Sequence, residues 1–283
     1  MALANQSFVF QTDSHLIKNS LNDPNYLIEY SEDNLDKKYC IVYFSSHNIY
    51  YPNTEHNFKK NILVNNKFEW FGLRIKKGYK HIFIRDIQKQ WYLKGINNQI
   101  NSIEKTKIFL ENEIKGYKTI MLGSSAGGYA AVLFGSLLNS EYIYSFNGQF
   151  KVDDLLESSS ELIDPIIFRE KDNLLINKYF SIKKFINNPN KIFYFHSNKS
   201  NWDLRNKNHI SDTAINIIEF KTSVHGIPFV KSALRYVINA NLNEIISWNL
   251  KIFHPILFSI KYGGFVETVK ILLKKIKSKI WKK

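Results

Sequence analysis

The sequence has little sulfur, no long apolar run and no clustered metal ligands. Its single cysteine, Cys40, excludes an internal disulfide and fits a reducing cytoplasm, which is the location we expect. No apolar run approaches the roughly 18 residues that suggest a membrane span. The opening residues, MALANQSFVFQTDS, lack the features of a secretory signal. The histidines are scattered without H-x-x-x-H spacing, so we expect no metal site.

Acidic residues are fewer than basic ones, and the excess of positive charge is spread unevenly along the chain. The net charge is +14, of which +8 falls between Trp248 and Lys283, where nine lysines face one acid, Glu267. In GFVETVKILLKKIKSKIWKK the apolar residues recur at three- and four-residue steps, which predicts a basic amphipathic helix over 264–283 within a tail of 246–283. Such a helix either binds an anionic membrane surface, peripherally on the inner membrane, or packs on the domain. No nucleic-acid reading module is recognised, so nucleic acid is not an expected partner.

Short runs of β-branched and aromatic residues alternate with helical stretches. Strands are predicted at 39–45, 81–86, 118–123, 142–148, 191–197 and 216–222. Helices are predicted at 101–115, with Asn101 and Glu104 as a capping box, and at 127–138 and 230–239. This rhythm predicts an α/β fold with a mostly parallel central sheet and helices on both faces. SFVFQ and YLIEY would pair antiparallel at the sheet edge, and 150–190 would form an insertion over the sheet edge, all within a domain of 1–245.

The stretch TIMLGSSAGGYAAVLFGSLL contains the pattern G-x-S-x-G around Ser125. It directly follows a predicted strand and opens a helix of small residues, the setting of a nucleophile elbow. A phosphate-binding loop or a tight packing turn are the alternatives. A Walker loop would need Lys followed by Ser or Thr after its glycines, and the dinucleotide fingerprint has a different spacing. The elbow is the favoured interpretation, with Ser125 as the nucleophile.

A serine nucleophile needs a base and an acid that orients the base. His225 follows the predicted strand 216–222 and Asp203 follows the strand 191–197, so both should reach the same sheet edge as Ser125, in the order Ser, Asp, His. The main rival acids are Asp153 and Asp154, with Asp212 behind them.

The oxyanion hole and the site lining can be placed by the same logic. The N–H of Ala126, after the nucleophile, should be one donor, and Ser46 or His47, in the loop after strand 39–45, should supply the other. His47 could instead touch substrate or lie solvated in its loop. Weaker candidates for lining the site, from the ends of the early strands, are Ser45, Asp86, Trp91 and Tyr92.

With these ordered features, residues 39–239 resemble the α/β-hydrolase superfamily. LGSSAGG and the helix after it look like the bacterial capsule polysaccharide O-acetyltransferases of that fold. The resemblance implies an acetyl-enzyme on Ser125, acetyl-coenzyme A as donor, no resident cofactor, and a glycan hydroxyl as acceptor, although no separate coenzyme A signature is present. The alternatives are a carboxylesterase or thioesterase for a small or lipid substrate, and a non-catalytic membrane-associated scaffold.

Overall fold

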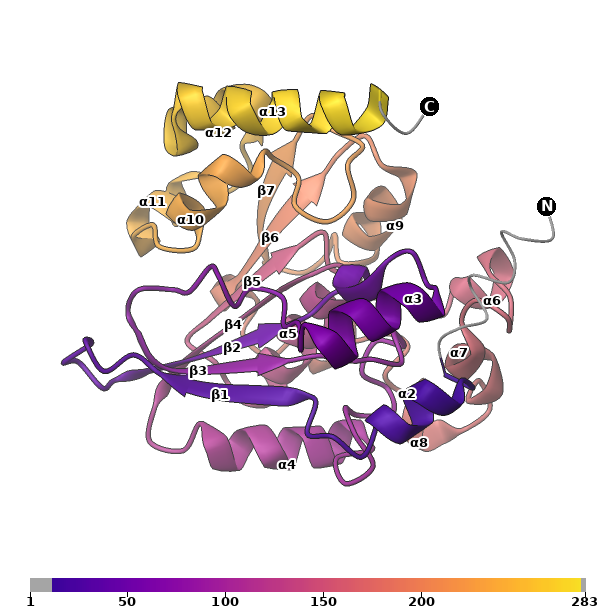
Figure 1. Ribbon diagram of the computed structural model, residues 1–283. Helices are drawn as coiled ribbons and strands as arrows, with labels where there is room; N and C mark the ends of the chain where they lie inside the picture. The colour runs from indigo at the N-terminus through magenta and orange to yellow at the C-terminus, as the bar shows by residue number, and fades with distance from the viewer. Residues whose placement is uncertain (1–11, 281–283) are drawn as a thin grey trace.

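The computed structural model describes residues 12–280, and an eight-stranded sheet forms its centre (Figure 1). The strands lie in the order β1-β3-β2-β4-β5-β6-β7-β8, and β1 pairs antiparallel with β3 while the other neighbours are parallel. Their bounds are β1 Tyr26–Tyr30, β2 Tyr39–Phe44, β3 Gly78–Ile84, β4 Lys118–Ser124, β5 Tyr142–Phe146, β6 Ile192–Ser197, β7 Asn216–Phe220 and β8 Ile252–Phe253.

Both faces of the sheet are covered, because the central strands are apolar on both sides. In β2, Val42 and Phe44 join the core on one face, and Ile41 and Tyr43 join the core on the other. The first face carries α4 (Ile103–Glu113) and α5 (Ala126–Leu137), and the second carries α10 (Leu234–Val237), α11 (Leu242–Ser247) and α12 (Pro255–Gly263). The predicted fold class, an α/β-hydrolase-like sheet, is confirmed.

Most of the remaining elements are short. The remaining α-helices are α2 His15–Ser20, α3 Glu55–Phe58, α6 Leu155–Ser158, α7 Pro165–Arg169, α8 Leu174–Asn177, α9 Asn201–His209 and α13 Phe265–Ile280. Short 3₁₀ turns span His47–Tyr50, Lys183–Phe185, Pro189–Lys191 and Lys231–Ala233, and a π turn spans Lys59–Val64.

The predicted insertion at 150–190 contains α6, α7 and α8. In Figure 1 these helices lie beyond the tips of the β2 and β3 arrows, close to α2. Ile166, Ile167 and Phe180 anchor the segment in the core on the α5 side of the sheet. The insertion therefore borders the carboxyl ends of the strands.

The strand YLIEY lies at the sheet edge and pairs antiparallel with β3, and its expected partner, residues 7–11, lies outside the described residues. Two local expectations need correction. The cap of α4 is Ser102, whose hydroxyl accepts the N–H of Lys105, and not Asn101. The helix predicted at 230–239 is reduced to a 3₁₀ turn followed by α10.

The predicted domain boundary at 245/246 also needs correction. Residues after it supply β8 to the sheet, and Trp248 and Phe258 to the core. The Ser259 hydroxyl accepts the N–H of Val230 at 2.9 Å, which fixes α12 to the domain. The tail as a separate element therefore starts at α13. Among the described residues, no helix combines the length and the apolar character that crossing a membrane requires.

Candidate active site

Ser125 lies on a sharp turn between β4 and α5. Its backbone has φ 54° and ψ −124°, a conformation that costs a non-glycine residue on the order of 1–3 kcal/mol. A Cβ on Gly123 would lie 2.2 Å from the Gly127 carbonyl oxygen, and one on Gly127 would lie 2.3 Å from the Phe44 carbonyl oxygen. Only glycine fits these two positions, so the G-x-S-x-G pattern is a steric requirement of this turn.

Three side chains from distant parts of the chain meet at this turn. The Ser125 Oγ lies 2.7 Å from His225 Nε2, and His225 Nδ1 lies 2.8 Å from Asp203 Oδ1. This arrangement has His225 donating its Nδ1–H to the carboxylate, which leaves Nε2 as an acceptor for the serine hydroxyl. The structure thus brings together the three residues that the sequence nominated as a triad.

Asp203 is held in place by the start of α9. Its side chain is 1% exposed, and its N–H donates to the hydroxyl of Ser200, the cap of the helix. A carboxylate in the first turn of a helix is stabilised by the helix dipole. The rival acids are engaged elsewhere: Asp153 pairs with Lys151, and Asp154 and Asp212 pair with Arg205 and Lys183.

The loop that carries His225 is held by Asn147, a residue that the sequence analysis did not single out. Asn147 Nδ2 lies 3.2 Å from the Val224 carbonyl oxygen and 3.0 Å from that of Gly226, on either side of His225. Its Oδ1 accepts the N–H of Ser197, whose hydroxyl also donates to the Val224 carbonyl. Asn147 and Ser197 therefore hold the loop that carries His225 in place at the edge of the sheet.

Two backbone N–H groups are the candidates for an oxyanion hole. Ala126 is the first residue of α5, so its N–H has no partner within the helix. Of the two candidates in the β2 loop, Ser46 already donates its N–H to Glu69 Oε2 at 2.6 Å and its hydroxyl to Glu69 Oε1. Ser46 is therefore corrected to a structural role, which leaves the N–H of His47, at the start of the next 3₁₀ turn, as the remaining candidate.

The His47 ring forms one wall of the site. It meets the Trp91 ring edge-on, with centroids 4.5 Å apart. Burial, more than the neighbouring Lys89 and His225, lowers the pKa of His47 to about 3. The imidazole is neutral at physiological pH, so it adds no positive charge beside His225.

The loop after β3 is built around the Asp86 carboxylate. Asp86 accepts the backbone N–H groups of Gln88, Lys89, Gln90 and Tyr92. The loop holds Lys89, Trp91 and Tyr92 at positive φ (56°, 52° and 61°). This places Lys89 and Trp91 in the lining of the site.

The other weak candidates for lining the site lie beneath it. Asp86 is the buried carboxylate that accepts the four N–H groups of its own loop, and burial raises its pKa to about 6. Tyr92 donates its hydroxyl to the Ser45 carbonyl, and Ser45 itself is buried. Asp86, Tyr92 and Ser45 therefore support the site from behind, a correction to the expectation that they line it.

Gln149 is a second functional candidate that the sequence analysis missed. Its Oε1 accepts the indole N–H of Trp91, which turns Nε2 toward Ser125 Oγ at 3.4 Å and His225 Nε2 at 3.3 Å. Gln149 follows β5 at the carboxyl edge of the sheet, and this position is the feature of the sequence that could have identified it as a candidate.

His225 lines two cavities. The first, about 410 Å³, is lined by Ser125, His225, Gln149 and Trp91 together with His47, Asn48, Tyr51, Asn53, Lys89, Ile163, Asp164 and Trp202. The second, about 470 Å³, combines Phe68, Trp70, Phe71 and Phe229 with Lys67, Lys231 and Lys275, and it also reaches Ser46 and His225. The site therefore has room for two ligands next to one histidine.

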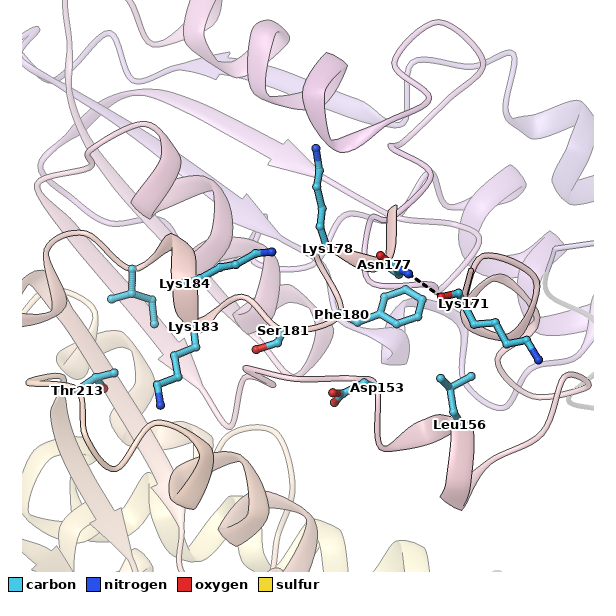
Figure 2. Close-up of a pocket in the computed structure, with 11 residues that line it drawn as sticks. Asp153, Leu156, Lys171, Asn177, Lys178, Phe180, Ser181, Lys183, Lys184 and Thr213 are labelled. Carbon is cyan, nitrogen blue, oxygen red and sulfur yellow. Dashed lines mark hydrogen bonds between the residues drawn. The ribbon is translucent and has the colours of Figure 1, made fainter. Parts of the chain in front are cut away.

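A separate hollow of about 790 Å³ lies in the insertion and contains four lysines, but none of the three triad candidates (Figure 2). Figure 2 shows Lys178, Lys183 and Lys184 pointing in different directions. Lys178 pairs with Glu104 at 3.0 Å and Lys183 with Asp212 at 2.6 Å. The ammonium groups do not converge on one point, so this hollow is not arranged as an anion site.

The chain is similar to several solved structures at low sequence identity. No protein-family model and no curated protein matches it. Among solved structures, it is similar to the capsule O-acetyltransferase of Neisseria meningitidis serogroup A (18% identity, TM-score 0.47, covering 69% of this chain and 82% of that one). It is similar also to a mutant of that enzyme in complex with CoA (18%, 0.44, 79% and 88%). A third is the S-formylglutathione hydrolase of Staphylococcus aureus (10%, 0.46, 76% and 87%). Each TM-score is below 0.5, so these likenesses do not identify the chemistry of the site.

Proposed function

We propose that the protein is a serine acyltransferase that works through an acyl-enzyme on Ser125 and transfers an acetyl group from acetyl-coenzyme A to a hydroxyl of a cell-surface glycan. The observation that carries the proposal is the unbroken chain of contacts from Ser125 Oγ through His225 to Asp203, with the serine on a strained turn. A base at hydrogen-bond distance from a nucleophile, itself oriented by a carboxylate, is the arrangement that activates a serine.

In the first half-reaction, His225 Nε2 takes the proton from Ser125 Oγ as the oxygen attacks the acyl carbonyl carbon. The carbonyl oxygen becomes an oxyanion that accepts the N–H groups of Ala126 and His47, and the N-terminus of α5 adds its favourable dipole. When the intermediate collapses, the bond to the leaving group breaks and His225 gives its proton to that group.

In the second half-reaction, an acceptor hydroxyl gives its proton to His225 and attacks the acyl-enzyme carbonyl. The bond to Ser125 Oγ then breaks, and the serine recovers its proton from His225. Gln149 Nε2, which reaches both Ser125 and His225, is placed to hold the incoming oxygen in line.

Two features favour transfer over hydrolysis. Two cavities meet at His225, one for each partner of a transfer. The second cavity joins an aromatic floor to three lysines, which suits an acyl thioester whose carrier bears phosphates. The first presents Trp91 and Trp202 beside amide side chains, a lining that suits a sugar with its apolar ring face and polar rim.

The serine mechanism is tested with a fluorophosphonate probe, which reacts with activated serines. We expect labelling of the wild-type protein and none of Ser125→Ala, with Ser124→Ala, its neighbour in sequence, as the matched control that keeps the label. Equal labelling of wild type and Ser125→Ala, or no labelling of a folded wild type, would contradict the proposal and favour the non-catalytic scaffold.

Transfer is then separated from hydrolysis by following coenzyme A release from acetyl-coenzyme A with and without polysaccharide acceptors. We expect release to rise when an acceptor is present and the acetyl group to appear on the glycan. Release that ignores every acceptor, together with positive probe labelling, would leave the serine chemistry standing and make the protein an esterase or thioesterase.

A further inference from the structure

Helix α13 is attached to the domain by a polar residue. Thr268 is completely buried, and its hydroxyl lies within hydrogen-bond distance of the carbonyls of Gly264 (2.7 Å) and Ser259 (3.1 Å) and of the Ser232 hydroxyl (2.8 Å). The helix lies against α12 at the top of Figure 1, on the opposite side of the sheet from α4. The side of α13 that faces the domain is therefore defined by Thr268.

The apolar side of α13 points elsewhere. At about 100° per residue, most of its apolar residues gather in an arc of about 120° that begins about 40° beyond Thr268, while Ile271 lies on the other side of Thr268. We call it the apolar arc, and its members are Phe265, Val266, Val269, Leu272, Leu273 and Ile276. Four of them are exposed: Phe265 and Val266 at 64%, Leu273 at 53% and Ile276 at 54%. A helix packed by its apolar side would bury these residues, and this one leaves them in solvent.

Lysines border the exposed arc. Lys270 and Lys277 follow directly after Val266 around the helix, and Lys274 lies next to them; all three are exposed. In the part of the chain that the structure describes, none of the three forms an ion pair with a carboxylate. With nine lysines and one acid between Trp248 and Lys283, this part of the chain is strongly positive.

We propose that the apolar arc docks on an anionic membrane surface. Phe265, Leu273 and Ile276 would enter the boundary between headgroups and acyl chains, and Lys270 and Lys277 would contact lipid phosphates. A second copy of the chain is a poor occupant, because a symmetric contact through α13 would bring two sets of lysines together without matching acids. An anionic lipid surface offers acyl chains to the apolar arc and phosphates to the lysines.

Docking would also affect the candidate active site, and this consequence rests on the proposed function. Lys275, on α13, lines the same cavity as His225 and Ser46. A docked helix would hold His225, which lines both cavities, close to the lipid headgroups, so the class of acceptor that the site favours is one tethered to the membrane.

Docking is tested by sedimenting the full chain with vesicles of phosphatidylcholine alone or mixed with phosphatidylglycerol. We expect binding to the mixed vesicles only, and binding that weakens as salt is added. Leu273→Glu with Ile276→Glu should abolish it, and each of Lys270→Gln, Lys274→Gln and Lys277→Gln should weaken it about fivefold. Ile108→Glu, at a 55% exposed isoleucine on α4, is the matched control and should bind like wild type.

Fluorophosphonate labelling of Ser125 is measured on the same variants, so a failure of docking and a failure of the proposed function give different results. No binding of wild type to the mixed vesicles at low salt, or unchanged binding of the Leu273→Glu, Ile276→Glu variant, would overturn the proposal. So would a dimer in analytical ultracentrifugation that this variant dissociates, because the arc would then be a self-association surface.

Discussion

The loops around Ser125 and the helix α13 are built in opposite ways. Around the serine, five non-glycine residues have positive φ, namely Lys89, Trp91, Tyr92, Ser125 and Asn147. Such conformations persist only where the surroundings over-determine them, and here buried carboxylate and amide groups do so. Among its described residues, α13 has no positive φ and has few buried side chains.

This difference shows which property each region depends on for its function. The serine loops depend on the positions of a few atoms, so replacing one oxygen by one nitrogen should have a large effect. Helix α13 depends on the composition of its surface, so a single change there should leave the fold and the chemistry intact. The following variants test that contrast, from the largest expected effect to the smallest.

Asp203→Asn should cause the largest loss. The amide keeps the shape of the carboxylate but favours the wrong tautomer of His225 and does not stabilise the imidazolium that forms during attack. Turnover of p-nitrophenyl acetate should fall by about 10³- to 10⁴-fold, with circular dichroism unchanged. Asp153→Asn, at the main rival acid, is the control and should keep full activity; a loss below tenfold in Asp203→Asn would remove Asp203 from the triad.

Lys89→Met should change how stability depends on pH. Burial lowers the pKa of Lys89 to about 7, whereas in the unfolded chain the lysine keeps a pKa near 10.5. Between these values the unfolded state binds a proton that the folded state has released, so the unfolding free energy of the wild type rises with pH. The stability that neutral Lys89 contributes is therefore lost gradually as pH falls from about 10.5, and it is gone by about pH 7.

The wild-type unfolding free energy minus that of Lys89→Met should therefore increase by up to about 1.4 kcal/mol per pH unit, or about 2 kcal/mol from pH 7 to 9, because half of the folded molecules still carry the proton at pH 7. Urea denaturation across this range measures the difference. Lys105→Met, on the exposed side of α4, controls for the loss of a lysine, and a flat difference for Lys89→Met would show that the ammonium remains hydrated.

The sequence predicted the meeting of Ser125, Asp203 and His225 because parallel strands bring their carboxyl ends to one edge, and each residue follows such an end. It did not predict Asn147, Gln149 or Glu69, because their partners lie 23 to 79 residues away in the chain. Tertiary packing alone decides whether such a polar side chain points into the site or holds a loop.

The other errors have local causes. Asp86 follows a strand end like Asp203, but its carboxylate turns inward onto its own loop, a choice that residue type does not reveal. Asn101 and Ser102 are both good caps, so the boundary of α4 was ambiguous by one residue. β8 has two residues, too few for a recognisable pattern, which is why the boundary at 245/246 was wrong.

Asn147→Asp should impair the site through the position of His225. Aspartate tolerates the positive φ of 45° but has no N–H groups to donate to the Val224 and Gly226 carbonyls. We expect p-nitrophenyl acetate turnover to fall about 10- to 100-fold, mainly in kcat. Asn139→Asp, at an exposed turn with φ 51°, is the matched control, and equal activity of the two variants would mean that the loop holds itself.

The smallest effects belong to α13, where the usual roles of polar and apolar residues are reversed. Thr268→Val removes the buried hydroxyl that contacts Gly264, Ser259 and Ser232, and it should lower the unfolding free energy by about 1–2 kcal/mol. Leu273→Lys places a charge on a side chain that is already 53% exposed and should change stability by less than about 0.5 kcal/mol. Urea denaturation of both variants checks the contrast. If Leu273→Lys proved the more damaging change, α13 would pack through its apolar arc, and the surface that we assign to lipid would belong to the protein's own core.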